Sequence, residues 1–328
     1  MILGYAWVIG AYLVLKSLPV HFPVFQVLRQ SIGSFWRYLL LGALFYSVVF
    51  IRKYVRKESY PVLTGSFWLE IIQISMILIM SMAFHFMLKC NIYLLNPRNF
   101  DALLFQIDRT IHFGIAPCFF FVTLFNSKIF YSCLDIFYSP FYYLINLAYV
   151  PAILVLASST VRRTFATAYV MICVAGLILY VLVPSWGPVF TYPEEFENAL
   201  SHMPITVKVQ TQIFKETSDL IRNPAGPRSI NLGGIAAFPS LHVALLTLFA
   251  LASKTISKRW FHLNLIFVGL MLIGTLVTGY HYLIDGYAGL IMGFGFYKLA
   301  WIWVRSKEAD VDPGRISAPP KPAEGLTN

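Results

Sequence analysis

The sequence predicts an all-α protein, a polytopic integral membrane bundle of about eight transmembrane helices. Hydrophobic residues make up 58 % of the 328 residues and charged residues only 12 %, against about 45–50 % and 25 % in soluble domains. The apolar residues gather in eight tracts without the alternating pattern of a membrane β-barrel. The composition excludes a disordered chain and disfavours a soluble enzyme.

The eight tracts form two groups. Residues 2–20 and 35–51 are predicted to be two accessory helices within residues 1–60. The first is interpreted as a retained helix, because it lacks the basic start and the cleavage site of a signal peptide. The other six tracts predict a membrane core within residues 61–305, at 67–88, 141–157, 165–183, 240–252, 263–278 and 283–304.

Two long connections lie between these tracts, and a tail follows the last of them. Residues 89–140 include an amphipathic stretch, 99–111, and an apolar run at 114–125. The run is too short for a span, so we expect an interfacial or re-entrant helix. The second long connection, residues 184–239, opens with helix-stopping prolines. Residues 306–328 are polar and Pro-rich, which predicts a disordered cytoplasmic tail.

The net charge of +10 is interpreted as a membrane feature, because no nucleic-acid-binding motif accompanies it. Basic residues follow the second, sixth and eighth tracts and precede the fifth. In an eight-span bundle these clusters share one side, which the positive-inside rule makes cytoplasmic together with both termini. The two long connections then face the extracytoplasmic side, whether periplasm, cell exterior or lumen.

The first candidate site residues lie where the sixth tract begins. Pro239 and Ser240 suit the first positions and the cap of a helix, whose free N–H groups form an anion site. His242 falls in the first turn, beside any anion held there. Gly234, just upstream, would let the backbone approach a ligand closely.

The second set is His281 and Asp285, which are four residues apart and share one face of a helix. The carboxylate can hold one imidazole nitrogen and leave the other free as a nucleophile or base. His242 begins an inward helix and His281 follows the return, so both should lie at one membrane depth. Two alternatives remain open: packed polar core residues, and a metal site built from the two histidines and the aspartate.

At these residues the sequence resembles the type-2 phosphatidic acid phosphatase superfamily. The family carries a P-S-x-x-H-like motif, here Pro239-Ser240-Leu241-His242, and a later H-x-x-x-D motif, here His281 to Asp285. Neighbouring features resemble the branch that contains the fungal inositol phosphorylceramide synthases: Phe238 and Val243 around the first motif, Gly187-Pro188, and Ile107-Asp108-Arg109 followed by Phe113-Gly114. The resemblance covers roughly residues 95–300 and implies a six-helix catalytic core.

The resemblance also implies a mechanism. His281 would attack phosphorus to form a phosphohistidine, and Asp285 would orient it. His242 would protonate the leaving alcohol and then deprotonate the acceptor, which is water in a phosphatase and another alcohol in a transferase. Ser240 and nearby N–H groups would hold the phosphoryl oxygens, with no metal or cofactor required.

The sequence departs from the family pattern in its cations. Family phosphatases usually have an arginine six residues before the second histidine, where this chain has Thr275. They also carry a K-x6-R-P-like motif before the serine motif, and residues 180–238 contain none. We expect other cations to meet the phosphate, with Arg228 first and Arg222 and Arg109 next. Each could instead be a headgroup or surface contact.

Two acidic residues of the amphipathic stretch have a second interpretation. Asp101 and Asp108 are seven residues apart and share a helix face. We interpret them as the wet face of an interfacial helix, with headgroup binding as the alternative.

The predicted function is a lipid phosphotransferase similar to inositol phosphorylceramide synthases, acting in phospholipid and sphingolipid metabolism. Its partners would be a phospholipid donor, a lipid alcohol or water as acceptor, and the membrane, with no nucleic acid. One alternative is a phosphatase of phosphatidate, prenyl pyrophosphate or a similar lipid. Another, of a different class, is a non-catalytic lipid transporter or scaffold.

Overall fold

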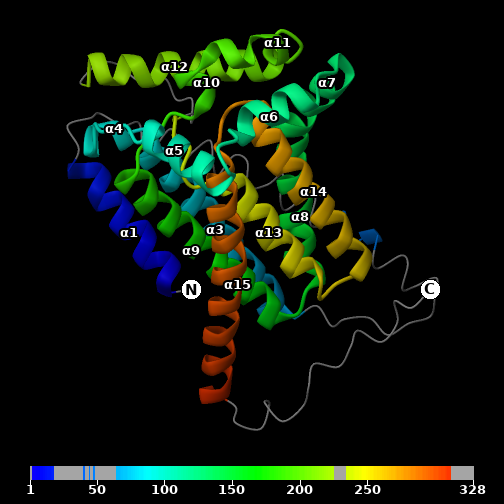
Figure 1. The fold of residues 1–328 in the computed structure, drawn as a ribbon. Coiled ribbons are helices and arrows are strands. Elements are labelled where there is room, and N and C mark those ends of the chain that lie inside the picture. The colour runs from blue at the N-terminus through cyan, green and yellow to red at the C-terminus, as the bar shows by residue number, and fades with distance from the viewer. Residues whose placement is uncertain are drawn as a thin grey trace.

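A computed structural model shows the chain as a bundle of helices (Figure 1). It describes residues 2–17, 40, 44, 47, 48, 64–224 and 234–311, and within these ranges every regular element is helical. The all-α prediction is confirmed. The predicted helix at 35–51 and the predicted tail at 306–328 lie largely outside the described residues.

Most predicted tracts correspond to helices of the structure. Four helices are long and apolar enough to cross a membrane: α3 (Gly65–Lys89), α9 (Ser159–Leu182), α14 (Lys258–Val277) and α15 (Leu283–Val311). Three shorter apolar helices accompany them: α1 (Ile2–Ser17), α8 (Tyr142–Leu156) and α13 (Leu241–Ser253).

The apolar run at 114–125 forms a helix too short to span alone. It folds as α6 (Pro117–Leu124), which meets α7 (Lys128–Ile136) at an angle of 119°. This bent pair is a broken span or a re-entrant loop. Counted as one span, it raises the candidate spans among the described residues from four to five. These helices fit a multi-pass membrane protein.

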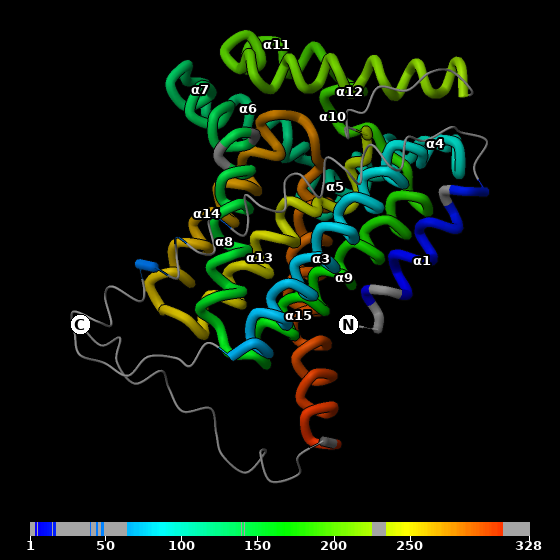
Figure 2. The backbone as a smooth tube through the Cα atoms, turned by 180° about the vertical axis from the view of Figure 1, so that it is seen from behind, coloured from blue at the N-terminus to red at the C-terminus, as the bar shows by residue number. Residues whose placement is uncertain are grey.

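The centre of the bundle is α13, which packs against α9, α14 and α15. On the far side of α9 lies α3, and α1 packs on α3 and α9, as the view from behind shows (Figure 2). A π-helical turn, η1 (Phe137–Phe141), leads from α7 into α8 and contacts α14. The core of the bundle is therefore formed by α3, α8, α9, α13, α14 and α15.

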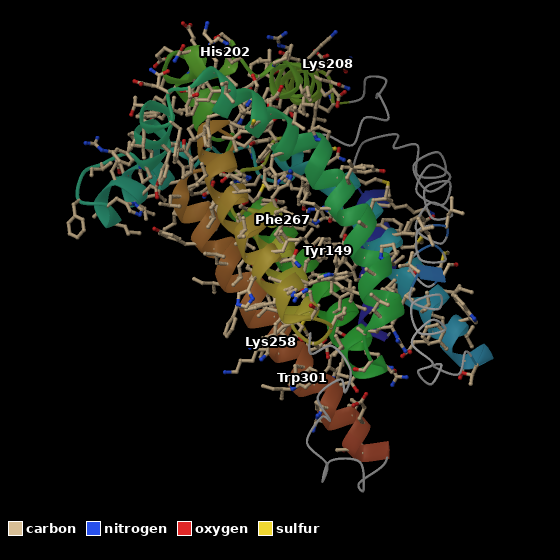
Figure 3. All side chains as sticks on the ribbon, turned by 90° about the vertical axis from the view of Figure 1, so that its right-hand side faces the viewer. Tyr149, His202, Lys208, Lys258, Phe267 and Trp301 are labelled. Atoms are coloured by element: carbon tan, nitrogen blue, oxygen red, sulfur yellow. The ribbon has the colours of Figure 1, made fainter. Side chains whose placement is uncertain are left out.

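One end of the bundle is covered by a layer of short and amphipathic helices. They are α4 (Ile92–Leu95), α5 (Asp101–Ile111), α10 (Pro188–Thr191), η2 (Pro193–Phe196), α11 (Glu197–Leu200) and α12 (Pro204–Arg222). His202 and Lys208 lie in this layer, whereas Lys258 and Trp301 lie toward the opposite end (Figure 3). We call these two the covered end and the open end.

Polar contacts join three helices near the open end. Glu70 of α3 forms ion pairs of 2.8 Å with Arg162 and 2.6 Å with Arg163, both in the first turn of α9. Thr160 donates to the carboxylate of Glu308, near the end of α15, at 3.0 Å. The start of α3, the start of α9 and the end of α15 are thereby held together.

Close contact between α13 and α15 depends on glycine. A Cβ added at Gly293 would lie 2.6 Å from the carbonyl oxygen of Ala244 and 2.7 Å from Cβ of Thr247. A Cβ at Gly289 would collide with the carbonyl oxygen of Ser240. Small residues let two membrane helices approach backbone to backbone, and here they bring α15 against the start of α13.

We expect Gly293→Ala to destabilise the protein and Gly295→Ala to leave its stability nearly unchanged. The added methyl group at 293 meets backbone, which costs about 1–3 kcal/mol in an overpacked core, whereas nothing lies within 4 Å at 295. Thermal unfolding of the purified variants in one detergent measures both effects. Equal melting temperatures for the two variants would contradict the packing described here.

Candidate active site

The two histidine motifs meet where α13 and α15 begin. Ser240 is the N-cap residue of α13, as predicted for a helix starting near that serine, and His242 lies in its first turn. His281 stands two residues before α15, and Asp285 lies in its first turn. The backbone N–H of Ser240 donates to the carbonyl oxygen of Asp285 at 3.0 Å, which ties the two helix starts together.

His281 and Asp285 form a buried pair. Their exposed fractions are 4 % and 0 %. Nδ1 of His281 lies 3.3 Å from Oδ2 of Asp285, and the same oxygen accepts the backbone N–H of Tyr282 at 2.9 Å. A proton on Nδ1 satisfies this arrangement and assigns the lone pair to Nε2.

The environment of His281 favours its neutral form. Burial, followed by the positive charge of Lys89, lowers the pKa of the His281 imidazole to about 3, and a hydrogen bond with the Ala237 backbone offsets this only in part. The ring is therefore neutral near pH 7, the state in which a ring nitrogen can act as a nucleophile.

His242 faces His281 across the start of the two helices. Their ring centroids are 6.3 Å apart and the ring planes are inclined by 71°. Tyr142 and Tyr138 flank His242 at centroid distances of 4.7 and 5.3 Å. Tyr138 is carried by the π-helical turn η1, a type of irregularity that is common at functional sites.

Both histidines line one cavity of about 470 Å³, within the range of about 300–1,000 Å³ usual for ligand sites. Val209 and Ile213 of α12 line it from the covered end. From the histidines the lining continues between α3, α8, α9 and α13, where it is mainly apolar: Leu78, Ile79, Met82, Val150, Ile172 and Leu245. The cavity thus joins a polar site to an apolar region within the helical core.

A model of the PAP2 superfamily matches residues 102–299, well over half of the chain. The chain belongs to the PAP2 superfamily. Comparisons with curated proteins and with solved structures found no significant match. Membership supports an enzyme of the phosphatase type, and the apolar helices fit a multi-pass membrane location.

In this PAP2 superfamily member, Asp108 positions the start of α15. Its side chain is 1 % exposed and accepts the backbone N–H groups of Leu283 at 3.1 Å and Ile284 at 3.0 Å. These groups follow His281 by two and three residues and would otherwise lack helical partners. Asp108 therefore fixes the segment that carries His281.

Asp101, seven residues earlier on α5, has a similar role. It is also 1 % exposed and accepts the N–H groups of Trp186 at 2.7 Å and Gly187 at 2.8 Å, and the hydroxyl of Tyr282 at 3.1 Å. Our interpretation of Asp101 and Asp108 as a wet face or headgroup contacts was wrong. Both face inward and bind backbone groups.

Ser185 connects this layer to the start of α13. Its hydroxyl accepts the N–H of Phe238 at 3.0 Å, and its carbonyl oxygen accepts the N–H of Ala237 at 3.0 Å. The segment that leads into His242 is therefore held by the loop that Asp101 holds.

Of the predicted binding residues, Gly234 and Ser240 lie at the site, whereas Arg109 lies on the surface. Gly234 lines the cavity and packs on α3, where an added Cβ would lie 2.9 Å from Cα of Cys90. Ser240 is fully buried, and its hydroxyl has no hydrogen-bond partner among the described residues. Arg109 is exposed on α5 and donates to the carbonyl oxygen of Gly114 at 3.0 Å.

The remaining two arginines do not join the histidines in the described structure. Arg222 is exposed at the end of α12, and Arg228 lies outside the described residues. In the described ranges, no group of three or more His, Cys, Asp and Glu side chains is placed to hold a metal ion. Thr275 is buried and donates to the carbonyl oxygen of Leu272 at 2.8 Å.

We did not predict Lys89, Tyr138 of η1 or Tyr142 of α8 as site residues. All three line the cavity with the histidines. Lys89 ends an apolar tract and resembles an ordinary interfacial lysine, and Tyr138 and Tyr142 belong to an aromatic-rich membrane chain. The one signal for Lys89 in the sequence was its predicted membrane depth. Lys89 follows the tract at 67–88, whose end is predicted on the same outer side of the membrane as both histidines.

We expect Asp108→Ala to lower the melting temperature markedly, because two backbone N–H groups at the start of α15 would lose their buried acceptor. One unpaired buried donor costs about 1–3 kcal/mol. Asp219→Ala, at an exposed position of α12, is the control and should change stability little. Thermal unfolding in detergent compares the two, and an unaffected Asp108→Ala protein would contradict the positioning role.

Proposed function

We propose that this PAP2 superfamily member transfers the phosphorus-containing group of a lipid through a covalent intermediate on His281. The observation that carries the proposal is the shared cavity: a buried, oriented histidine and a second histidine stand at the polar end of a mainly apolar space. A lipid phosphate has the same division into a polar group and an apolar chain.

The proposed steps use the residues at the helix starts. Nε2 of His281 attacks phosphorus, an N–P bond forms, and the bond from phosphorus to the leaving alcohol breaks. Asp285 holds Nδ1–H and stabilises the positive charge that develops on the ring. His242 gives its proton to the leaving oxygen as a general acid.

The second half of the reaction reverses the proton movement. His242 takes the proton of the acceptor hydroxyl, whose oxygen attacks phosphorus, and the N–P bond to His281 breaks. The separation of 6.3 Å between the two ring centroids is short enough for one phosphoryl group to contact both. The backbone N–H groups at the start of α13, together with Ser240, would hold the phosphoryl oxygens.

Within this chemistry we favour a transferase similar to inositol phosphorylceramide synthases. Its support is the sequence: the neighbouring motif features resemble that branch, and Thr275 stands where the phosphatases have an arginine. A lipid phosphate phosphatase is the second candidate, supported by membership of the PAP2 superfamily.

We further propose that the covered end faces the extracytoplasmic side. Arg162 and Arg163 begin α9 near the open end, and Lys258 lies toward the same end. The positive-inside rule then makes the open end cytoplasmic, so both histidines would work close to the outer surface.

The reaction is tested with purified protein in detergent, offered phospholipids and lipid phosphates with and without ceramide as acceptor. Mass spectrometry quantifies new phospholipid and free phosphate. We expect new phospholipid that depends on the acceptor, and a loss of at least about 1,000-fold in turnover for His281→Ala. His262→Ala, an exposed histidine on α14, should retain full activity.

Each result decides between the candidates. Free phosphate without new phospholipid would favour the phosphatase. Unchanged turnover by His281→Ala would contradict the covalent mechanism, and no turnover of any lipid by the wild-type protein would favour the non-catalytic transporter or scaffold.

The apolar part of the cavity predicts a dependence on chain length. Ile79→Trp would fill space between α3 and its neighbours, and excluding as few as two methylene groups costs about 1.6 kcal/mol, more than tenfold in affinity. We expect KM to rise by at least about tenfold for a long-chain substrate and little for its short-chain analogue. Leu69→Trp, at an exposed position of α3, is the control; equal effects on both chain lengths would contradict a chain-binding role.

A further inference from the structure

A phosphate group held at His242 and His281 needs a positive charge nearby. The two histidines lie in a buried site, and an anion taken out of water without a partner is costly. His281 is neutral at the start of the reaction, and the proton that the proposed mechanism places on His242 leaves with the alcohol, so neither ring supplies a lasting positive charge. Arg109 and Arg222, the two predicted cations that the structure describes, are both exposed and neither lines the cavity.

Lys89 is the one lysine or arginine in the described lining of this cavity. It is the last residue of α3, and its side chain is half-buried. Its Nζ lies 5.3 Å from the ring centroid of Tyr180, another lining residue. Among the described residues, no carboxylate lies within ion-pair distance of Lys89. The ammonium group therefore faces the cavity side without a compensating negative charge there.

The backbone fixes Lys89 relative to the histidines. Gly234 packs so closely on the end of α3 that an added Cβ would lie 3.0 Å from the carbonyl oxygen of Lys89. From Gly234 the chain runs through Ala237, which Ser185 holds, into the turn that carries His242. The charge of Lys89 also acts on the His281 ring, which places the ammonium group within electrostatic reach of the proposed nucleophile.

We propose that Lys89 binds the phosphate group of the lipid substrate and supplies the positive charge of the site. The proposal rests on the proposed function, since it assumes that a lipid phosphate occupies the cavity. Lys89 precedes the residues 102–299 matched by the superfamily model, so the superfamily match does not assign this role. An ammonium group is a compact charge with three donors, suited to phosphoryl oxygens.

Binding is measured without turnover, in a His281→Ala background that also carries Lys89→Met, Lys89→Arg or Lys208→Met. The probes are phosphatidate and diacylglycerol with the same acyl chains, in detergent micelles. Ligand-dependent thermal shifts give an apparent Kd for each lipid, and the difference between the two lipids reports recognition of the phosphate. Lys208 is an exposed lysine of α12 and serves as the matched control.

We expect Lys89→Met to raise the Kd for phosphatidate by roughly 10- to 100-fold, the size of a lost charge-assisted hydrogen bond. The Kd for diacylglycerol should stay the same, which also shows that the variant is folded. Lys89→Arg should stay within a few fold of the parent, and Lys208→Met should match it.

Two results would overturn the proposal: a Lys89→Met protein that still prefers phosphatidate as the parent does, or a parent that binds both lipids equally. Turnover by the protein with His281 intact is assayed separately. A protein that binds phosphate through Lys89 but converts no lipid would refute the proposed reaction and leave the binding role standing.

Discussion

The arrangement of the site depends on the close approach of α13 and α15. Gly289 and Gly293 let the two helices meet backbone to backbone, and the N–H of Ser240 reaches the carbonyl oxygen of Asp285 at 3.0 Å. Without this contact, His242 and His281, which are 39 residues apart in the sequence, would not share a cavity. An added Cβ at either glycine would meet the backbone of α13, so a bulkier residue there would push the two helices apart.

Buried aspartates at the covered end hold the backbone around the site, and they bind backbone N–H groups rather than a ligand. Asp101 and Asp108 of α5 accept N–H groups from the loop after α9 and from the start of α15. Asp135 does the same for Ile205 and Thr206 at the start of α12. Carboxyl oxygens are strong acceptors for free backbone N–H groups, so three buried aspartates organise the segments around the cavity. A rigid surround of this kind suits a reaction that needs two histidines at a fixed separation.

Helix positions, the start of α13 and the meeting of the histidines could be predicted from the sequence, because long apolar tracts and i, i+4 spacing are local signals. The partners of Asp101 and Asp108 could not, since N–H groups at 186, 187, 283 and 284 are remote in sequence. An amphipathic helix with acidic residues seven apart is also typical of a wet interfacial face. The role of Lys89 could not be predicted for a related reason. A lysine at the end of an apolar tract usually extends to the headgroups, and only the fold shows that Lys89 shares a cavity with the histidines.

The central claim is a covalent intermediate on His281. The direct measurement is mass spectrometry of the protein after brief reaction with a lipid donor and quenching in alkali, where phosphohistidine survives, with His242→Ala used to slow the second half of the reaction. We expect a phosphorus-containing adduct on the peptide that carries His281, absent from His281→Ala. An adduct on another residue, or none in a protein that turns over lipid, would contradict it.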